Sequence, residues 1–178
     1  MIPPKGIQYS IETLCLDCKE YVLKYQNVEQ FLPMCRKCGN YGKLYTCPPF
    51  DEERYSLLNE YKTLELVIMR VSPGDLEQYF RAREYFDALL LSKESERNGS
   101  LALFAGSCIV CDAGCCGRPS GRGCFHKERS RLSLEALGFD VTATLSDFFQ
   151  IELEWAEDGK QIGQMVLLGA LVADKFVV

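Results

Sequence analysis

Eight of the ten cysteines in this 178-residue chain fall in two short segments rich in turn-forming residues. The first loop, residues 34–50, holds Cys35, Cys38 and Cys47. The second loop, residues 106–126, holds Cys108, Cys111, Cys115, Cys116 and Cys124. Thiolates are soft ligands that select zinc or iron–sulfur clusters over magnesium or calcium. Because Gly, Ser, Pro and Asp separate these thiols and turn the backbone, we expect both loops to fold around metal.

Each loop contains a C-x2-C pair, Cys35–Cys38 in the first and Cys108–Cys111 in the second. Four cysteines commonly hold a [4Fe–4S] cluster, and the Cys47-Pro48 step is similar to the Cys-Pro element of ferredoxins. Structural zinc is the main alternative, since it also uses paired C-x2-C motifs. The usual spacer between two zinc half-sites is about 12–20 residues, far shorter than the gap between these pairs. We therefore favour iron–sulfur over zinc.

The spacing suggests one or two clusters with different ligand sets. Cys108, Cys111, Cys124 and either Cys116 or Cys115 would hold one cluster. Cys35, Cys38 and Cys47 would hold the other, with a fourth ligand from Cys115 or from the separate pair Cys15 and Cys18. The simpler interpretation of Cys15 and Cys18 is that both thiols pack as small hydrophobic groups.

Three functions fit these motifs. The first is an electron-transfer module that works with a redox partner protein. The second is an interaction protein stiffened by zinc, and the third is an enzyme with an open cluster coordination site. Nucleophilic cysteine catalysis ranks lower because the chain has a single histidine, His126, which we interpret first as a structural residue.

Composition and charge narrow the class of protein. Hydrophobic residues make up 47% of the chain and the net charge is −5, as in many soluble domains. Basic residues gather only around the second loop, at Arg118, Arg122, Lys127, Arg129 and Arg131. This local patch argues against nucleic-acid binding; it is a solvated loop, or it offsets thiolate charge or docks an acidic partner. The sequence leaves the oligomeric state open.

No secretory leader and no apolar run that could span a membrane is evident in the sequence. We therefore expect a cytoplasmic protein with no membrane partner. In a reducing compartment, clustered cysteines favour metal binding over disulfides.

Hydrophobic periodicity predicts helices at 20–32, ending at Pro33, at 51–62, from a Ser72-Pro73 cap to about Glu96, and at 130–138. Strands are predicted at 64–71, 100–106, 140–145, 149–156 and 163–173, with a hairpin turn at 157–160. The first two strands and the helix between them suggest a βαβ unit with parallel strands, which would present the second loop at a strand end. The expected fold is a single α+β or mixed α/β domain over residues 1–178, with about five strands and three or four helices.

Three motifs resemble a family of predicted metal-binding proteins, domain of unknown function 2284. They are C-x2-C-x2-Y-G-x4-C-P-P from Cys35, G-x-C-x2-C from Gly106, and C-x-H-x4-R-x-S-x-E-A-x-G-x-D-V from Cys124 to Val141. The resemblance implies a bound metal and no defined reaction. In that family one cysteine follows the second C-x2-C closely. Cys116 matches it best, which leaves Cys115, Cys15 and Cys18 as additions.

Overall fold

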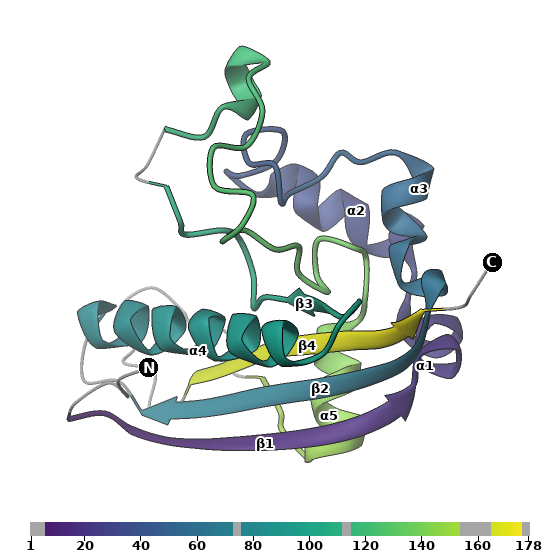
Figure 1. Cartoon of the computed structure of the whole chain (residues 1–178), viewed down its shortest axis with the longest axis vertical. Coiled ribbons are helices and arrows are strands. Elements are labelled where there is room, and N and C mark those ends of the chain that lie inside the picture. The colour runs from purple at the N-terminus through teal and green to yellow at the C-terminus, as the bar shows by residue number, and fades with distance from the viewer. Residues whose placement is uncertain (1–5, 73–75, 112–114, 154–164, 176–178) are drawn as a thin grey trace.

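A four-stranded antiparallel sheet forms the base of the molecule (Figure 1). The computed structural model describes residues 6–72, 76–111, 115–153 and 165–175. Its strands are β1 (Gln8–Asp17), β2 (Tyr61–Ser72), β3 (Leu101–Leu103) and β4 (Met165–Lys175), in the order β1-β2-β4-β3. The α-helices are α1 (Cys18–Tyr25), α2 (Val28–Lys37), α3 (Glu52–Tyr55), α4 (Leu76–Glu96) and α5 (Val141–Phe149), and two 3-10 turns span Leu57–Glu60 and Arg118–Ser120.

Both faces of the sheet are covered, so β2 alternates between two apolar cores. Leu64, Leu66 and Ile68 face a core shared with α1 and α5. Val67, Met69 and Val71 face a second core under α4. Gly169 lets α4 approach β4 closely, because a Cβ there would lie 2.5 Å from Leu90 Cδ1. The predicted α+β class is therefore confirmed, with four strands among the described residues where about five were expected.

The predicted βαβ unit is wrong in its pairing. β2 and β3 each pair antiparallel with β4, so they run in the same direction, but β4 lies between them. The near-continuous apolar run in β2 is typical of a parallel strand. Here the same run arises because helices and loops cover both faces of an antiparallel sheet. The prediction that the second loop leaves the end of a strand is confirmed, since β3 leads directly to Gly106.

The single helix expected at 20–32 is two helices. Asn27 separates them: its backbone N–H donates to the Gly138 carbonyl at 2.8 Å, and its side chain caps α2. α2 does not end at Pro33 but continues to Lys37. This correction matters for the site, because it places Cys35 in the last turn of a helix.

Two further predictions around residues 130–145 are wrong. Residues 130–138 form turns instead of a helix, because Phe104 pairs with this segment through the Leu132 carbonyl at 2.8 Å. The strand expected at 140–145 is α5, whose N-terminus is capped by the Asp140 carboxylate. Tertiary pairing and a helix cap outweigh the local preference in both places.

The remaining elements divide into confirmed and untested ones. The strands near 64–71, 100–106 and 163–173 and the long helix that becomes α4 are confirmed. Asp51 caps a helix as expected, but the helix expected at 51–62 is the short α3 followed by the 3-10 turn at Leu57–Glu60, and residues 61–62 begin β2. Gln150 adopts a left-handed conformation, and residues 150–153 form no strand. The rest of the strand expected at 149–156, the hairpin turn at 157–160 and the Pro73 cap lie outside the described residues.

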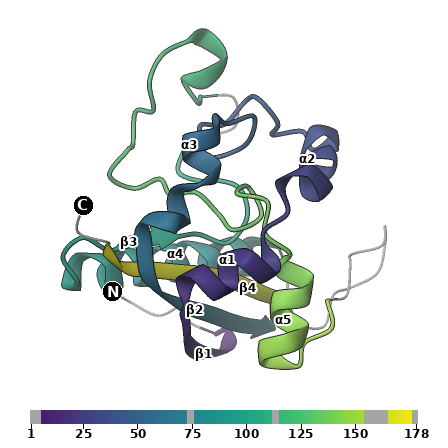
Figure 2. The same ribbon diagram turned by 90° about the vertical axis from the view of Figure 1, so that its right-hand side faces the viewer.

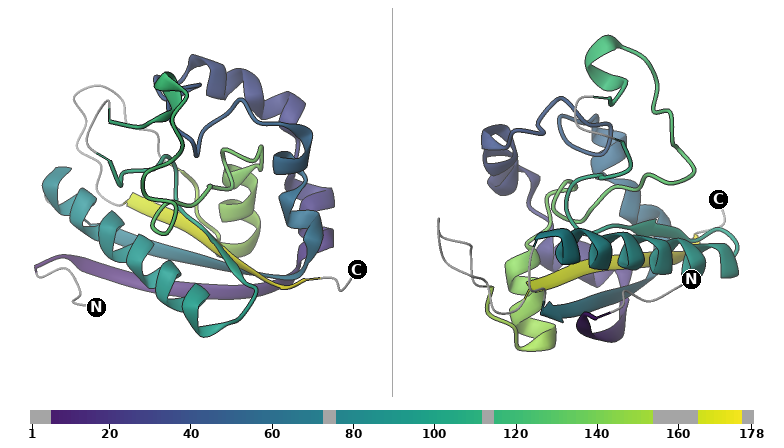
Figure 3. Two further views of the ribbon diagram at one scale, coloured as in Figure 1. Left: turned by 45° about the horizontal axis from the view of Figure 1, so that its top comes forward. Right: turned by 90° about the vertical axis from the view of Figure 1, so that its left-hand side faces the viewer.

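Both cysteine loops lie beyond the β3 edge of the sheet (Figures 1 and 2). The segment at 132–133 covers that edge, whereas β1 forms the opposite one. Figure 3 shows the same separation between the loops and the sheet from two further directions. Within the described part of the chain, no helix has the length and apolar character needed to cross a membrane.

Candidate metal centre

The first loop is a helix end followed by a series of tight turns. Cys35 lies in the last turn of α2, and the Cys38 N–H donates to the Cys35 carbonyl at 3.0 Å. Gly42, at a φ of 70°, closes the loop by donating to the Pro48 carbonyl at 2.7 Å. Cys47 is buried at 8% exposure. These turns place the three thiols close enough that Cys38 and Cys35 both raise the pKa of Cys47.

The second loop begins over a buried ion pair on α4. Arg83 and Asp87 are 4% and 8% exposed, and their side chains meet at 3.1 Å. Arg83 also donates to the Ser107 carbonyl at 2.8 Å. Gly106 has a φ of 63°, and its N–H donates to the Glu135 carboxylate at 3.4 Å. Side chains from outside the loop therefore fix the backbone that leads into Cys108.

Further along, the second loop folds back on itself at Gly117. The Arg122 N–H donates to the Gly117 carbonyl at 2.9 Å. A Cβ at Gly117 would lie 2.6 Å from the Gly123 carbonyl oxygen, closer than real Cβ atoms approach. The fold-back therefore requires glycine at this position, and it sets the separation between Cys116 and Cys124.

Direct hydrogen bonds join the two loops. The Arg118 guanidinium donates to the carbonyls of Leu44 and Pro49, each at 2.6 Å, and to that of Cys47. In the other direction, the Tyr45 hydroxyl donates to the Arg122 carbonyl. In the sequence Arg118 is one of several basic residues around the second loop, and no local pattern indicates this role. The arginine is the clasp between the loops, since it satisfies three first-loop carbonyls with one side chain.

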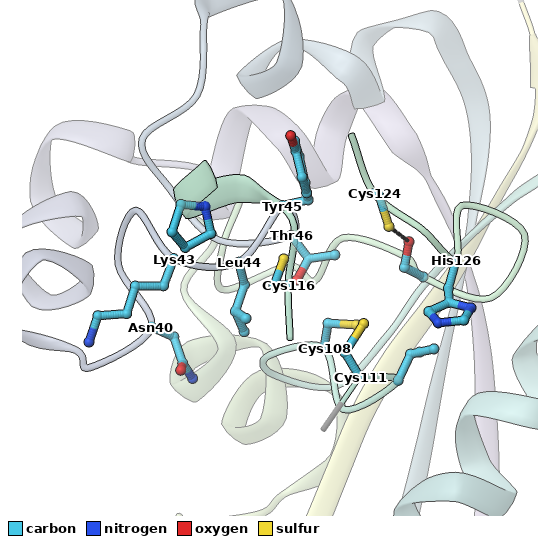
Figure 4. Close-up of a pocket in the computed structure, with 13 residues that line it drawn as sticks. Asn40, Lys43, Leu44, Tyr45, Thr46, Cys108, Cys111, Cys116, Cys124 and His126 are labelled. Carbon is cyan, nitrogen blue, oxygen red and sulfur yellow. Dashed lines mark hydrogen bonds between the residues drawn. The ribbon is translucent and has the colours of Figure 1, made fainter. Parts of the chain in front are cut away.

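Between the loops lies a cavity of about 260 Å³. Figure 4 shows four second-loop cysteines around it, Cys108, Cys111, Cys116 and Cys124. The first loop supplies the opposite wall with Asn40, Lys43, Leu44, Tyr45 and Thr46. The sequence did not predict that these first-loop residues line the cavity. None of them is a usual ligand of a soft metal, and only the tertiary structure brings them to the cavity.

Electrostatic interactions between the thiols divide the cysteines into a first-loop group and a second-loop group. Burial raises the pKa of Cys108, and the neighbouring Cys111 and Cys124 raise it further. Burial likewise raises the pKa of Cys47 to about 11, with Cys38 and Cys35 adding to the effect. Each thiol is thus disfavoured as an isolated thiolate inside its group. A bound cation would reverse that preference, since metals bind the deprotonated form.

Thr46 lines this cavity, and its hydroxyl is a buried polar group. Its oxygen is inaccessible to solvent and makes no hydrogen bond of normal geometry with any described residue. It lies near the Cys47 thiol, whose pKa it lowers. Buried hydroxyls are costly unless they are paired. The four thiols that line the cavity are the soft donors that an iron–sulfur cluster needs, so the residues present fit a sulfur-rich group.

The remaining cysteines lie elsewhere. Cys15 is exposed on β1, the sheet edge opposite the loops, so it does not pack as a buried thiol. Cys18 is fully buried, and its thiol donates to the Leu58 carbonyl at 3.4 Å, as expected for a small hydrophobic residue. Cys115 is exposed and does not line the cavity, whereas the adjacent Cys116 does.

Residues of the third motif mainly build the loop supports. Arg131 forms a two-point ion pair with Glu94, with distances of 2.6 and 2.8 Å. The Ser133 hydroxyl accepts from the Ala136 N–H, and Gly138 turns at a φ of 80° against Val28. His126 lines the cavity, and its Nδ1 lies 3.7 Å from Glu128.

Within the described residues, no group of three or more His, Cys, Asp or Glu side chains has the closeness needed for a single metal ion. The four second-loop thiols instead surround a larger space. One water needs about 10–15 Å³ of such volume, so a cavity of 260 Å³ exceeds the needs of a bare ion many times over.

The fold and the site together define a cysteine-rich α+β protein with two joined thiol loops. A model of the family described as predicted metal-binding protein, DUF2284, matches residues 14–172, and the chain belongs to that family. No curated protein matches the chain. No solved structure matches it either.

Proposed function

We propose that the second loop binds a [4Fe–4S] cluster through Cys108, Cys111, Cys116 and Cys124, and that the protein transfers electrons in the cytoplasm. The observation that carries this proposal is the placement of these four thiols around one cavity. Four cysteines are the usual ligand set of this cluster. When bound, the cluster supplies reversible one-electron oxidation and reduction.

The chain's own residues would hold and tune the group. The fold-back at Gly117 and the Arg83 contact to Ser107 fix the two ends of the ligand loop. Leu44 and Val110 add apolar surface to the cavity wall, which limits water near the sulfur atoms. Hydrogen bonding and solvent exclusion are the protein's main means of setting a cluster potential.

The first loop supports a second candidate site. Cys35, Cys38 and Cys47 lie within electrostatic reach of one another, although the described residues hold no three such side chains close enough for a single metal ion. Cys15 lies on the edge strand β1 and Cys18 is buried against Leu58, so the exposed Cys115 is the remaining candidate for a fourth ligand. A three-cysteine cluster keeps one iron open to a substrate. This arrangement favours the enzyme with an open coordination site as the second candidate function, located at the first loop.

Metal analysis of anaerobically purified protein tests the proposal. We expect iron and acid-labile sulfide in equal amounts, with a visible absorption band that dithionite bleaches. A colourless protein that holds stoichiometric zinc would instead establish the zinc-stiffened interaction protein.

Neighbouring cysteines in the second loop provide a matched pair of variants. Cys116→Ser should remove one cluster's share of iron and sulfide, because its thiol faces the cavity. Cys115→Ser should retain all of it, because that thiol is exposed outside the cavity. The opposite result would reassign the ligand set.

A further inference from the structure

Charge is distributed very unevenly over this molecule. The chain has 20 basic and 25 acidic residues. The first loop, the second loop and the turn at 127–131 hold eight of the basic residues and two of the acidic ones. The rest of the chain therefore has 12 basic against 23 acidic residues, a net charge of −11, while the loop segments carry +6.

Six of the loop cations are exposed on the surface of the loops. They are Arg36, Lys37 and Lys43 from the first loop and Arg122, Lys127 and Arg129 from the second loop and its following turn, and we call them the basic end. Among the described residues, none of the six forms an ion pair with a carboxylate. Their charge is therefore available to a partner.

The other two cations of these segments have internal roles. Arg118 donates hydrogen bonds to first-loop carbonyls, and Arg131 forms an ion pair with Glu94. Arg118 is also the cation that lowers the pKa of Cys47. The structure thus separates the arginines that serve the thiol loops from the cations that face outward.

Exposed apolar side chains accompany the basic end. Met34 is 64% exposed next to Cys35, and Phe125 is 52% exposed next to Cys124. The Arg122 guanidinium lies over the Phe125 ring, 5.4 Å from its centre. Exposed aromatic and methionine side chains are enriched in the cores of protein–protein interfaces.

We propose that the basic end is the docking surface for an acidic partner protein, which exchanges electrons with the cluster beside Cys124. This inference rests on the proposed function for the exchange, although docking itself does not require a cluster. A protein partner fits better than a nucleic acid, because the charge of −11 on the rest of the chain would repel a long polyanion. Docking at this end also orients the acidic partner, since the opposite end repels it.

Small redox probes test where electrons leave the molecule. One electron would pass from the reduced cluster to anionic hexacyanoferrate(III) or to cationic hexaammineruthenium(III). Although the whole protein has a charge of −5, we expect added salt to lower the rate of electron transfer to the anionic probe. The rate of transfer to the cationic probe should stay the same or rise. A salt response that follows the net charge of −5 would place electron exit away from the basic end.

Binding of a glutamate-rich peptide tests the surface without any need for the cluster. The double variant Lys127→Glu with Arg129→Glu should weaken peptide binding about tenfold, and salt should weaken it further. Lys19→Glu, an exposed change in α1 outside the cysteine loops, is the control and should have little effect. Equal losses in both variants, or no binding by the native protein, would overturn the docking surface.

Two outcomes separate this inference from the proposed function. Peptide binding with the expected variant pattern in a protein that lacks iron would retain the surface and refute the cluster. A protein that holds the cluster but shows no charge preference toward the peptide or the redox probes would retain the proposed function and refute the docking surface. If a single-stranded oligonucleotide of equal charge bound as tightly as the peptide, the surface would be a nucleic-acid site instead.

Discussion

The two cysteine loops achieve their shape in different ways. The first loop is built on its own backbone, from the end of α2 through successive turns to Pro48. The second loop has little regular structure, and its start depends on side chains from elsewhere, at Arg83 and Glu135. Backbone turns therefore build most of the first loop, whereas the junction between β3 and the second loop is positioned by side chains from α4 and from the segment after the loop.

This difference predicts a difference in tolerance. Changes that disturb the backbone of the second loop should alter the content of the proposed cluster, whereas changes in the first loop should have smaller effects on it. Four experiments test the comparison, in order of falling effect.

Gly117→Ala should have the largest effect. The new Cβ would meet the Gly123 carbonyl at 2.6 Å, so the fold-back must open. We expect about 3 kcal/mol of lost stability and loss of the second-loop cluster, measured by urea unfolding and iron content. Gly123→Ala is the control, since a Cβ there has nothing within 4 Å. Equal losses in both variants would show that the loop has no defined fold-back.

Arg118→Ala separates the loops by removing the clasp. Three first-loop carbonyls lose a charged donor, so we expect a loss of about 2 kcal/mol in the free energy of unfolding. Arg129→Ala, at an exposed cation, should stay within about 0.5 kcal/mol of the native value. An unchanged stability in Arg118→Ala would mean that the loops associate without the clasp.

Thr46→Val tests whether the first loop tunes the cluster of the second. Replacing the hydroxyl by a methyl group makes the cavity wall less polar, so the reduction potential of the proposed cluster should become more negative. The metal-free protein should be as stable as the native one or slightly more so, because an unpaired buried hydroxyl is removed. Thr46→Ser keeps the hydroxyl and should keep the potential. A potential that is identical in all three proteins would remove Thr46 from the site.

A pH experiment addresses the support under the second loop. Burial raises the pKa of Asp87 to about 6 from an ordinary value near 3.8, despite the opposing effect of Arg83. The folded state therefore binds this proton more tightly than the unfolded state does. The stability contributed by Asp87 is complete below about pH 4 and is lost as the pH rises through 6.

Comparison with Asp87→Asn isolates that contribution. The difference in unfolding free energy, native minus variant, should increase as the pH falls from 7 to 4. Glu53→Gln, at an exposed carboxylate on α3 that is not among the groups shifting the pKa of Asp87, should show no such trend. A difference that decreases toward acid would contradict the raised pKa of Asp87.

Local patterns predicted the elements that depend on local physics. The apolar run of β2, the long stripe of α4 and the Asp51 cap were all visible in the sequence. The prediction of a strand at 140–145 failed because Asp140 is also a helix cap, and Val141 and Leu145 share a helix face as well as alternating with polar residues. The same residues fit both the helical and the strand periodicity, and packing against α1 selects the helix.

The sequence by itself determined the chemistry of the site. Its eight clustered cysteines, their C-x2-C spacing and the glycines between them indicate metal, and the family match agrees. Tertiary structure decided the placement: β4 between β2 and β3, Cys116 rather than Cys115 at the cavity, and Thr46 and Arg118 at the junction of the loops. The physical reason is the distance along the chain over which each property is set. Ligand type is a property of single residues, whereas a cavity wall needs contacts between segments about 70 residues apart.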